Sequence, residues 1–242
     1  MKKIAGLLFF AVTTSTFAVA QEVNPAATPT TSEKGESKKR PSRDFVMLQL
    51  TYENWNGTPE DIHLTGIGRG FNGYLCYDFP IKESNFSFAA GIGLSVSNVY
   101  FKNQRVIMNS PEDQILFQDV DSTSQNLYKK SKLMTSYLEA PFEIRFFGNK
   151  ENRNQGFKAA VGMRVGVLIG ASAKSKNSLP GYTVVEKTNT KRYVQTWRFA
   201  PTVRVGWGNF SIYGSYNISQ LFNAGKGPEV FPYSLGICLS GL

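Results

Sequence analysis

Charged side chains alternate with apolar ones in several stretches of the chain, a spacing that gathers ionisable groups on one face of a strand. Glu139, Glu143 and Arg145 share such a face, and Leu138 and Phe142 occupy the opposite one. Two carboxylates on one face could act as a general acid and base. Neighbouring arginines would instead hold both carboxylates ionised. The spacing therefore favours a paired, structural charge network over acid–base catalysis.

Nine charged residues fall on faces of this kind, and they would meet inside a barrel if the strands close. The expected lumen charge network is Glu53, Asp78, Glu139, Glu143, Arg145, Lys158, Arg164, Arg198 and Arg204. An eight-stranded barrel is only wide enough for its side chains to fill, and buried ions must pair. We expect a salt-bridged plug in preference to a charged conduction path.

Other candidate chemistry is weak. His63 is the one histidine and lies in a loop beside Glu60 and Asp61, with no strand-borne Ser–His spacing that would form a hydrolase triad. The segment 119–121 (DVD) resembles part of a calcium loop but lacks its central Gly and closing Glu. We expect no catalytic residue, no metal and no cofactor.

The elements that position these residues follow from a period of two. In residues 86–97, FSFAAGIGLSVS, the even positions are apolar and the odd positions small or polar. Eight such stretches predict strands at 44–54, 67–79, 86–97, 136–146, 157–169, 198–207, 210–218 and 233–240. Short links join the second to the third, the fourth to the fifth and the sixth to the seventh. The other links are long, and 102–135 is the longest.

This alternation of short and long links is typical of outer-membrane barrels, whose short turns face the periplasm and whose long loops face outward. Residues 1–20 resemble a secretory signal peptide, with Lys2 and Lys3, an apolar run and a small-residue cleavage site. Residues 21–43 lack apolar periodicity and predict a disordered periplasmic tether. Residues 44–242 are then an all-β, eight-stranded antiparallel up-and-down transmembrane barrel in the outer membrane.

Aromatic residues and charge fit the same placement. Predicted strand ends carry Phe79, Phe86, Phe146, Phe157, Trp207 and Phe210 at one rim and Tyr52, Tyr100, Trp197 and Tyr216 at the other. The formal charge of +9 becomes 9 − 2 = +7 without Lys2 and Lys3. In an exported chain this favours attraction to anionic lipid headgroups, or simple solubility, over binding to nucleic acid. Arg69 faces outward near the outer rim, where it either contacts lipopolysaccharide phosphate or is an ordinary rim residue.

Two cysteines, Cys76 and Cys238, are predicted on strands separated by a third. Two strand spacings put their backbones about 10 Å apart, too far for a disulfide. We therefore expect two free, buried thiols.

Several motifs resemble the PorT-like outer-membrane β-barrel family of Gram-negative bacteria. They are GFN (70–72), YDFP (77–80), FSFAAGIG (86–93), YLEAPF (137–142) and SQLF (219–222). The resemblance covers about residue 44 to the C-terminus and implies an integral barrel without agreed catalytic residues.

The function predicted from the sequence is a structural or interaction role through the outer loops, with outer-membrane lipid, lipopolysaccharide and a protein as possible partners. The alternatives are a narrow small-solute channel and an outer-leaflet lipid-modifying enzyme. In the loop 102–135, the apolar residues could fold over the barrel mouth, pair as a hairpin or offer an edge to a partner. A mobile loop without a partner is the remaining alternative.

Overall fold

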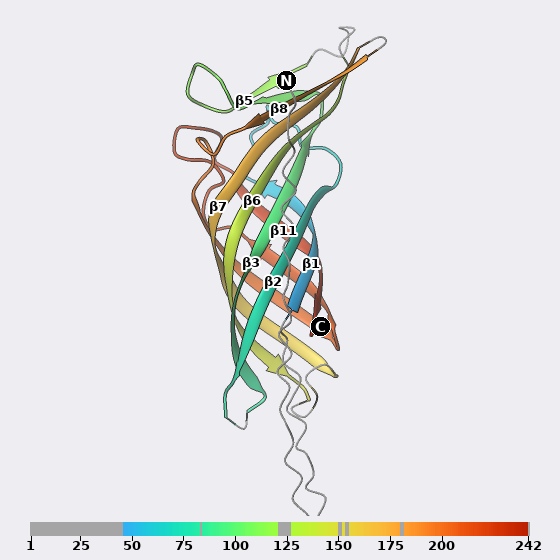
Figure 1. The fold of residues 1–242 in the computed structure, drawn as a ribbon, viewed down its shortest axis with the longest axis vertical. Coiled ribbons are helices and arrows are strands. Elements are labelled where there is room, and N and C mark those ends of the chain that lie inside the picture. Colours follow the sequence, from blue (N-terminus) through green and yellow to red (C-terminus); the bar gives the residue numbers. More distant parts are fainter. Residues whose placement is uncertain are drawn as a thin grey trace, which may run out of the picture. The chain divides into compact units, whose positions relative to one another are not determined.

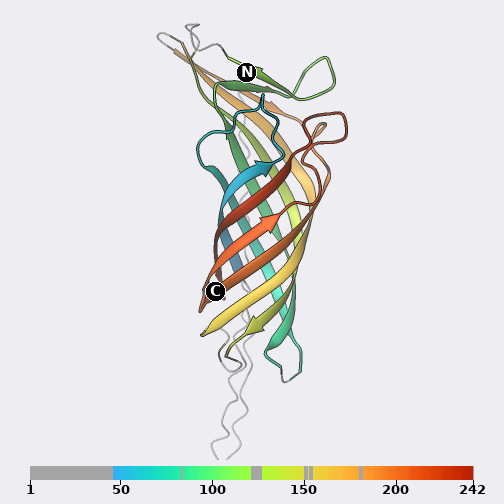
Figure 2. The ribbon, with the colours of Figure 1, turned by 180° about the vertical axis from the view of Figure 1, so that it is seen from behind.

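A computed structural model describes residues 46–82, 84–120, 127–149, 152, 155–179 and 182–241. The predicted signal peptide and tether lie outside these residues. Eight antiparallel strands form the barrel drawn in Figures 1 and 2. They are β1 (Val46–Asn56), β2 (Gly68–Pro80), β3 (Phe86–Phe101), β6 (Leu127–Phe147), β7 (Phe157–Leu179), β9 (Trp197–Trp207), β10 (Phe210–Tyr216) and β11 (Phe231–Ser240).

The barrel closes because its last strand pairs with its first. Neighbouring strands follow the order β1-β2-β3-β6-β7-β9-β10-β11, and β11 pairs with β1 from Met47↔Ser240 to Asn56↔Phe231. The predicted eight-stranded antiparallel barrel is confirmed. Within the described ranges there is no helix of the length and hydropathy needed to cross a membrane.

Side chains alternate between the lumen and the outside along each strand, as the period of two requires. On β2 the burial changes at every residue from Gly68 to Asp78. Large apolar side chains cover the outer surface, and Ile212 is 74% exposed and Ile237 56% exposed. Such a continuous apolar surface is expected to face lipid.

Short turns and long loops separate to opposite ends of the barrel. The turns after β2, β6 and β9 lie at the end where β1 begins and β11 finishes. The loops after β1, β3, β7 and β10 lie at the other end, which carries the labels β5 and β8 in Figure 1. The predicted parity of the links is therefore confirmed.

The predicted ends of the fourth and fifth strands were wrong, because β6 and β7 run well beyond the barrel. A further strand, β8 (Tyr182–Asn189), pairs with the upper part of β7. Beyond the lipid-facing band, outward positions such as Lys132 and Lys174 need not be apolar. The alternation of apolar outward and polar inward residues that marks a membrane strand is therefore lost there. A register shift between Ser136 and Tyr137 also leaves Ile169 without a cross-strand partner on β6.

The long loop after β3 contains a two-stranded hairpin. Strand β4 (Gln104–Ile107) pairs with β5 (Leu116–Asp119) in a separate small sheet. Apolar residues of this hairpin are buried over the barrel mouth. The loop therefore folds over the mouth and pairs as a hairpin, but this hairpin is a sheet of its own and does not extend the barrel strands, as the second alternative had it.

Candidate functional site: the barrel lumen and its loop cap

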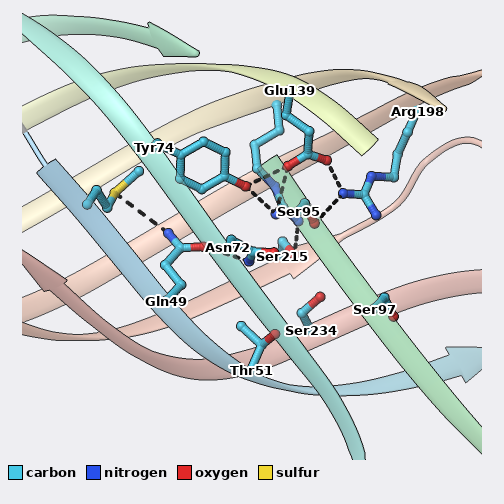
Figure 3. A network of polar contacts seen from close by, with 12 residues as sticks. Gln49, Thr51, Asn72, Tyr74, Ser95, Ser97, Glu139, Arg198, Ser215 and Ser234 are labelled. Atoms are coloured by element: carbon cyan, nitrogen blue, oxygen red, sulfur yellow. Dashed lines mark hydrogen bonds and ion pairs between the residues drawn. The ribbon is translucent and has the colours of Figure 1, made fainter. Parts of the chain in front are cut away.

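Glu139 on β6 belongs to a buried group of polar side chains inside the barrel (Figure 3). Its carboxylate accepts hydrogen bonds from Arg198 and from Arg164 Nη1, the latter at 3.3 Å. The Tyr74 hydroxyl donates to the same group at 2.5 Å. Three different strands therefore direct a donor at one carboxylate, which is then an ion held in place and not a free acid.

Glu53 on β1 is the second carboxylate at this level. It accepts hydrogen bonds from the hydroxyls of Thr51 at 2.5 Å, Ser97 at 3.2 Å and Ser234 at 3.0 Å. Gly70 lies opposite Thr51, and a Cβ there would overlap the Thr51 hydroxyl and the Glu53 carboxylate unless those side chains shifted. Glu53, Glu139, Arg164 and Arg198 together form what we call the upper charge cluster, which has two acids and two guanidiniums.

The two guanidiniums of the upper charge cluster are also enclosed by neutral side chains. Arg164 donates to Ser215 Oγ at 2.7 Å, and Arg198 donates to Ser95 Oγ at 2.8 Å. The Arg198 guanidinium also lies 4.1 Å from the centre of the Tyr137 ring. Both arginines are buried. These contacts replace part of the interaction with water that the guanidiniums lose on burial.

The lower charge cluster lies nearer the short turns. The Glu143 carboxylate accepts from Arg145 Nε at 2.7 Å and from Arg204 Nη2 at 2.9 Å. Asp78 accepts from the Ser87 hydroxyl at 2.8 Å and lies 3.7 Å from Arg145 Nη1. These two acids and two guanidiniums form a second balanced group.

Lys158, the ninth residue of the expected network, and a small apolar cluster also lie in the lumen. The Lys158 ammonium lies 5.6 Å from the centre of the Phe147 ring and is buried. A separate apolar cluster consists of Met47, Tyr74, Cys76, Tyr213 and Cys238. Both cysteines are free and buried, as predicted. All nine residues of the expected network therefore point into the lumen, in two groups at different heights.

The described part of the lumen has little empty space. One cavity of about 10 Å³ lies between the upper charge cluster and the loops and is lined by Glu53, Trp55 and Arg198. Another of about 10 Å³ lies beside Arg145 and Lys158. A single water needs about 10–15 Å³. Each of these two cavities therefore has room for about one water molecule at most.

Above the lumen the loops share an apolar core, which we call the loop cap. Its buried residues are Trp55, Ile62, Val99, Phe101, Val106, Met108, Ile115, Leu133, Tyr137, Leu168, Ala171, Ala173, Tyr193, Val194, Leu221, Phe222 and Val230. Trp55 makes edge contacts with Phe101 and Phe222, with ring centres 5.5 Å and 5.9 Å apart. Every long loop contributes to this core, so it covers the barrel mouth at the long-loop end.

Polar contacts also tie the outer loops together. Asp113 in the β4–β5 hairpin forms ion pairs with Lys226 and, at 2.6 Å, with Arg192. The hydrogen bond from Lys226 lowers the pKa of Asp113, and the charge of Arg192 acts in the same direction. Three loops therefore meet at one carboxylate that stays ionised in neutral solution.

Three further residues that the sequence analysis considered lie at the outer end. His63 has an exposed side chain, and its backbone N–H donates to Gln104 Oε1 at 2.8 Å. Arg69 is exposed on the outer surface of β2. Asp121 lies outside the described residues, and among those described no group of three or more His, Cys, Asp or Glu side chains could hold a metal ion.

Sequence reasoning missed the tyrosines and serines that complete the network, and most of the loop cap. Tyr74, Ser95 and Ser215 lie at inward positions of the same period of two, so their parity was a usable signal. Trp55 and Phe222 lie where strands become loops, and nothing in their local spacing indicates a shared core.

A closed eight-stranded barrel with an apolar outer surface and a polar lumen defines an outer-membrane β-barrel. The chain belongs to the family described as the outer membrane protein beta-barrel domain, whose model matches residues 45–223. No curated protein matches the chain.

Two solved structures of Ail, the attachment invasion locus protein of Yersinia pestis, are similar to this chain at 14% identity. Each comparison covers 83% of this chain and 99% of the Ail chain. The TM-scores are 0.37 for the complex of Ail with the heparin analogue sucrose octasulfate and 0.34 for the other structure. Scores this low say nothing about a ligand of this chain.

Proposed function

We propose that the protein is a non-catalytic, non-conducting outer-membrane barrel that acts through the outer surface of its loop cap. The observation that carries the proposal is the shared apolar core of all the long loops above a filled lumen. Such a core holds the loops in one arrangement, and a preformed surface loses less conformational entropy on binding than mobile loops do. In this proposal residues 1–20 direct export, residues 21–43 form a periplasmic tether, and the barrel that follows is PorT-like.

A depression of about 550 Å³ on the loop cap supports an interaction role. The β4–β5 hairpin lines one side of it with Ile107, Leu116 and Phe117, and Pro59 and Pro228 come from two other loops. Leu116 and Phe117 are only partly buried. A mostly apolar hollow with a polar rim fits side chains of a protein partner.

The two alternatives have less support. A lipid-modifying enzyme needs a base positioned against a nucleophile, and the side chain of His63 is exposed in a loop. A small-solute channel needs a continuous path, whereas the two cavities in the described lumen are each about 10 Å³. The charge clusters therefore favour a structural role for the lumen.

The interaction role is tested by crosslinking on intact cells, followed by purification of the barrel and its crosslinked partner. Leu116→Arg places a charge in the depression and is expected to reduce partner recovery about tenfold. Deletion of Val106 to Ser124 should abolish recovery while membrane insertion remains. The matched control is Ile81→Arg, which changes an exposed apolar residue in a short turn at the opposite end.

Unchanged recovery from both loop variants would contradict the proposal and move the interaction to another part of the chain. An equal loss of recovery from Ile81→Arg would also contradict it, because that residue is remote from the loop cap.

A further inference from the structure

Three lysines lie directly opposite one another on adjacent strands above the barrel. Lys132 on β6 pairs with Lys174 on β7, which pairs with Lys187 on β8. Directly opposite residues share a face of the sheet, and Cβ atoms in such pairs are about 5 Å apart. We call these residues the lysine row. Like charges at this spacing destabilise a sheet, so the row needs an explanation.

The lysine row faces outward, away from the loop cap. Its inward neighbours Leu133, Ala173 and Ser175 are buried, whereas Lys174 and Lys187 are exposed. Ile169 has no partner on β6, and the alternation along β7 changes at this point. Below Ile169 the even-numbered residues face inward, whereas above it Ala171 and Ala173 face inward and Lys174 faces outward.

The nearby carboxylate does not neutralise the lysine row. Glu186 on β8 pairs across from the inward-facing Ser175 and forms its ion pair with Arg105 of the hairpin. Among the described residues no ion pair joins a lysine of the row to a carboxylate. The row therefore presents three positive charges to whatever adjoins this face.

The height of the row matches the level of lipid headgroups. Lys132 pairs with Tyr100, one of the aromatic residues at the outer rim, and its ammonium lies 6.0 Å from the centre of that ring. Below it on the same strands lie the lipid-facing Leu94 and Leu138, which are 52% and 42% exposed. Aromatic rings of this kind mark the boundary between hydrocarbon and headgroups.

Arg69 extends the positive surface on the other side of Tyr100. Asn98 holds the two basic residues together, because its side chain donates to the Arg69 carbonyl at 3.4 Å and accepts from Lys132 Nζ at 2.7 Å. A hollow of about 270 Å³ beside them is lined by Arg69, Tyr100 and Gly66. Arg69 and Ser131, the neighbour of Lys132 on β6, both line this hollow, so a phosphate group placed here would lie beside Arg69 and next to the strand that carries Lys132.

We propose that Arg69 and the lysine row form a binding site for the phosphate groups of an outer-leaflet glycolipid such as lipopolysaccharide. The site deepens the contact proposed for Arg69 and rests on the proposed orientation, in which the long loops lie outside the cell. Cationic side chains bind phosphate through charge-assisted hydrogen bonds. In this site the phosphates remove the mutual repulsion of the lysines and anchor the β6–β7–β8 extension to the membrane surface.

Binding is tested with the full-length barrel in neutral maltoside micelles and purified lipopolysaccharide. K132Q/K174Q/K187Q is expected to weaken binding about 100-fold, because each surface lysine contributes measurably to the attraction of anionic headgroups. The matched control K82Q/K102Q/K191Q removes the same charge from exposed lysines in three links and should leave the affinity within about twofold. Lipopolysaccharide stripped of its phosphates should bind the unmodified barrel about as weakly as it binds the first variant.

Three results would overturn the proposal. The first is an unchanged affinity for lipopolysaccharide in K132Q/K174Q/K187Q, and the second is an equal loss of affinity in the control variant. The third is displacement of lipopolysaccharide by inorganic phosphate at an equal concentration of phosphate groups. A heat-modifiable gel band confirms that each variant is folded. Failure here leaves partner recovery by the loop cap unaffected, so the two proposals are distinguished.

Discussion

Glu139→Gln is expected to lower the free energy of unfolding by about 3–5 kcal/mol, the usual cost of removing one partner from a buried ion pair. The substitution keeps the shape of the side chain but removes the charge that Arg164 and Arg198 share. Both guanidiniums stay in a lumen that has almost no room for water. Urea unfolding of the barrel in lipid vesicles, followed by tryptophan fluorescence, measures the change.

The matched control is Glu186→Gln, which breaks the ion pair with Arg105 outside the barrel. The two side chains of that pair are 30% and 47% exposed, and an exposed pair contributes about 0–1 kcal/mol. If Glu139→Gln lowers the free energy of unfolding no more than this control does, the upper charge cluster does not stabilise the lumen.

Adding Arg198→Gln to Glu139→Gln should lower the free energy of unfolding by less than the sum of the single changes, because the second change removes one of the two charges left without a partner.

Trp55→Ala is expected to cost about 3–5 kcal/mol within the loop cap, since a buried aromatic side chain leaves a cavity when it is truncated. Trp55 is 6% exposed and contacts the rings of Phe101, Phe117 and Phe222. The loss should open the loops without opening the barrel, whose strands remain paired. Limited trypsin digestion should then cut the outer loops at least about tenfold faster, and cleavage at Arg105, Arg192 and Lys226 reports on this region.

Trp207→Ala is the control for this experiment. It makes the same truncation at a residue that is 70% exposed at the opposite rim, and it should leave loop cleavage unchanged. Equal cleavage of Trp55→Ala and the unmodified barrel would mean that the apolar core does not hold the loops.

The sequence was informative about the barrel because membrane strands obey one simple constraint. Each position faces either lipid or lumen, so a period of two assigns Ile212 to the outside and Tyr213 to the inside without knowledge of the rest of the chain. The same parity assigned Glu139 and Arg198 to the lumen, where geometry brings them into contact. Their partners on other strands could not be predicted, since strand stagger decides which residues share a height.

The outer part of the protein could not be predicted in the same way. Beyond the hydrocarbon core of the membrane, Lys132 and Lys174 occupy outward positions that would be apolar in the core, so the sequences of β6 and β7 there resemble those of loops. The irregularity at Ile169 changes the parity midway along β7. The loop cap joins Trp55, Phe117 and Phe222 from distant parts of the chain, and only the tertiary structure places them together.

Single-channel recording in planar bilayers tests most directly whether the lumen is plugged. A known porin in the same bilayers verifies that inserted barrels are detected, and the amount of inserted protein is measured independently. With the upper and lower charge clusters both intact, we expect no steady current from the unmodified protein. Large, stable conductance steps from that protein would contradict a filled lumen and favour a small-solute channel.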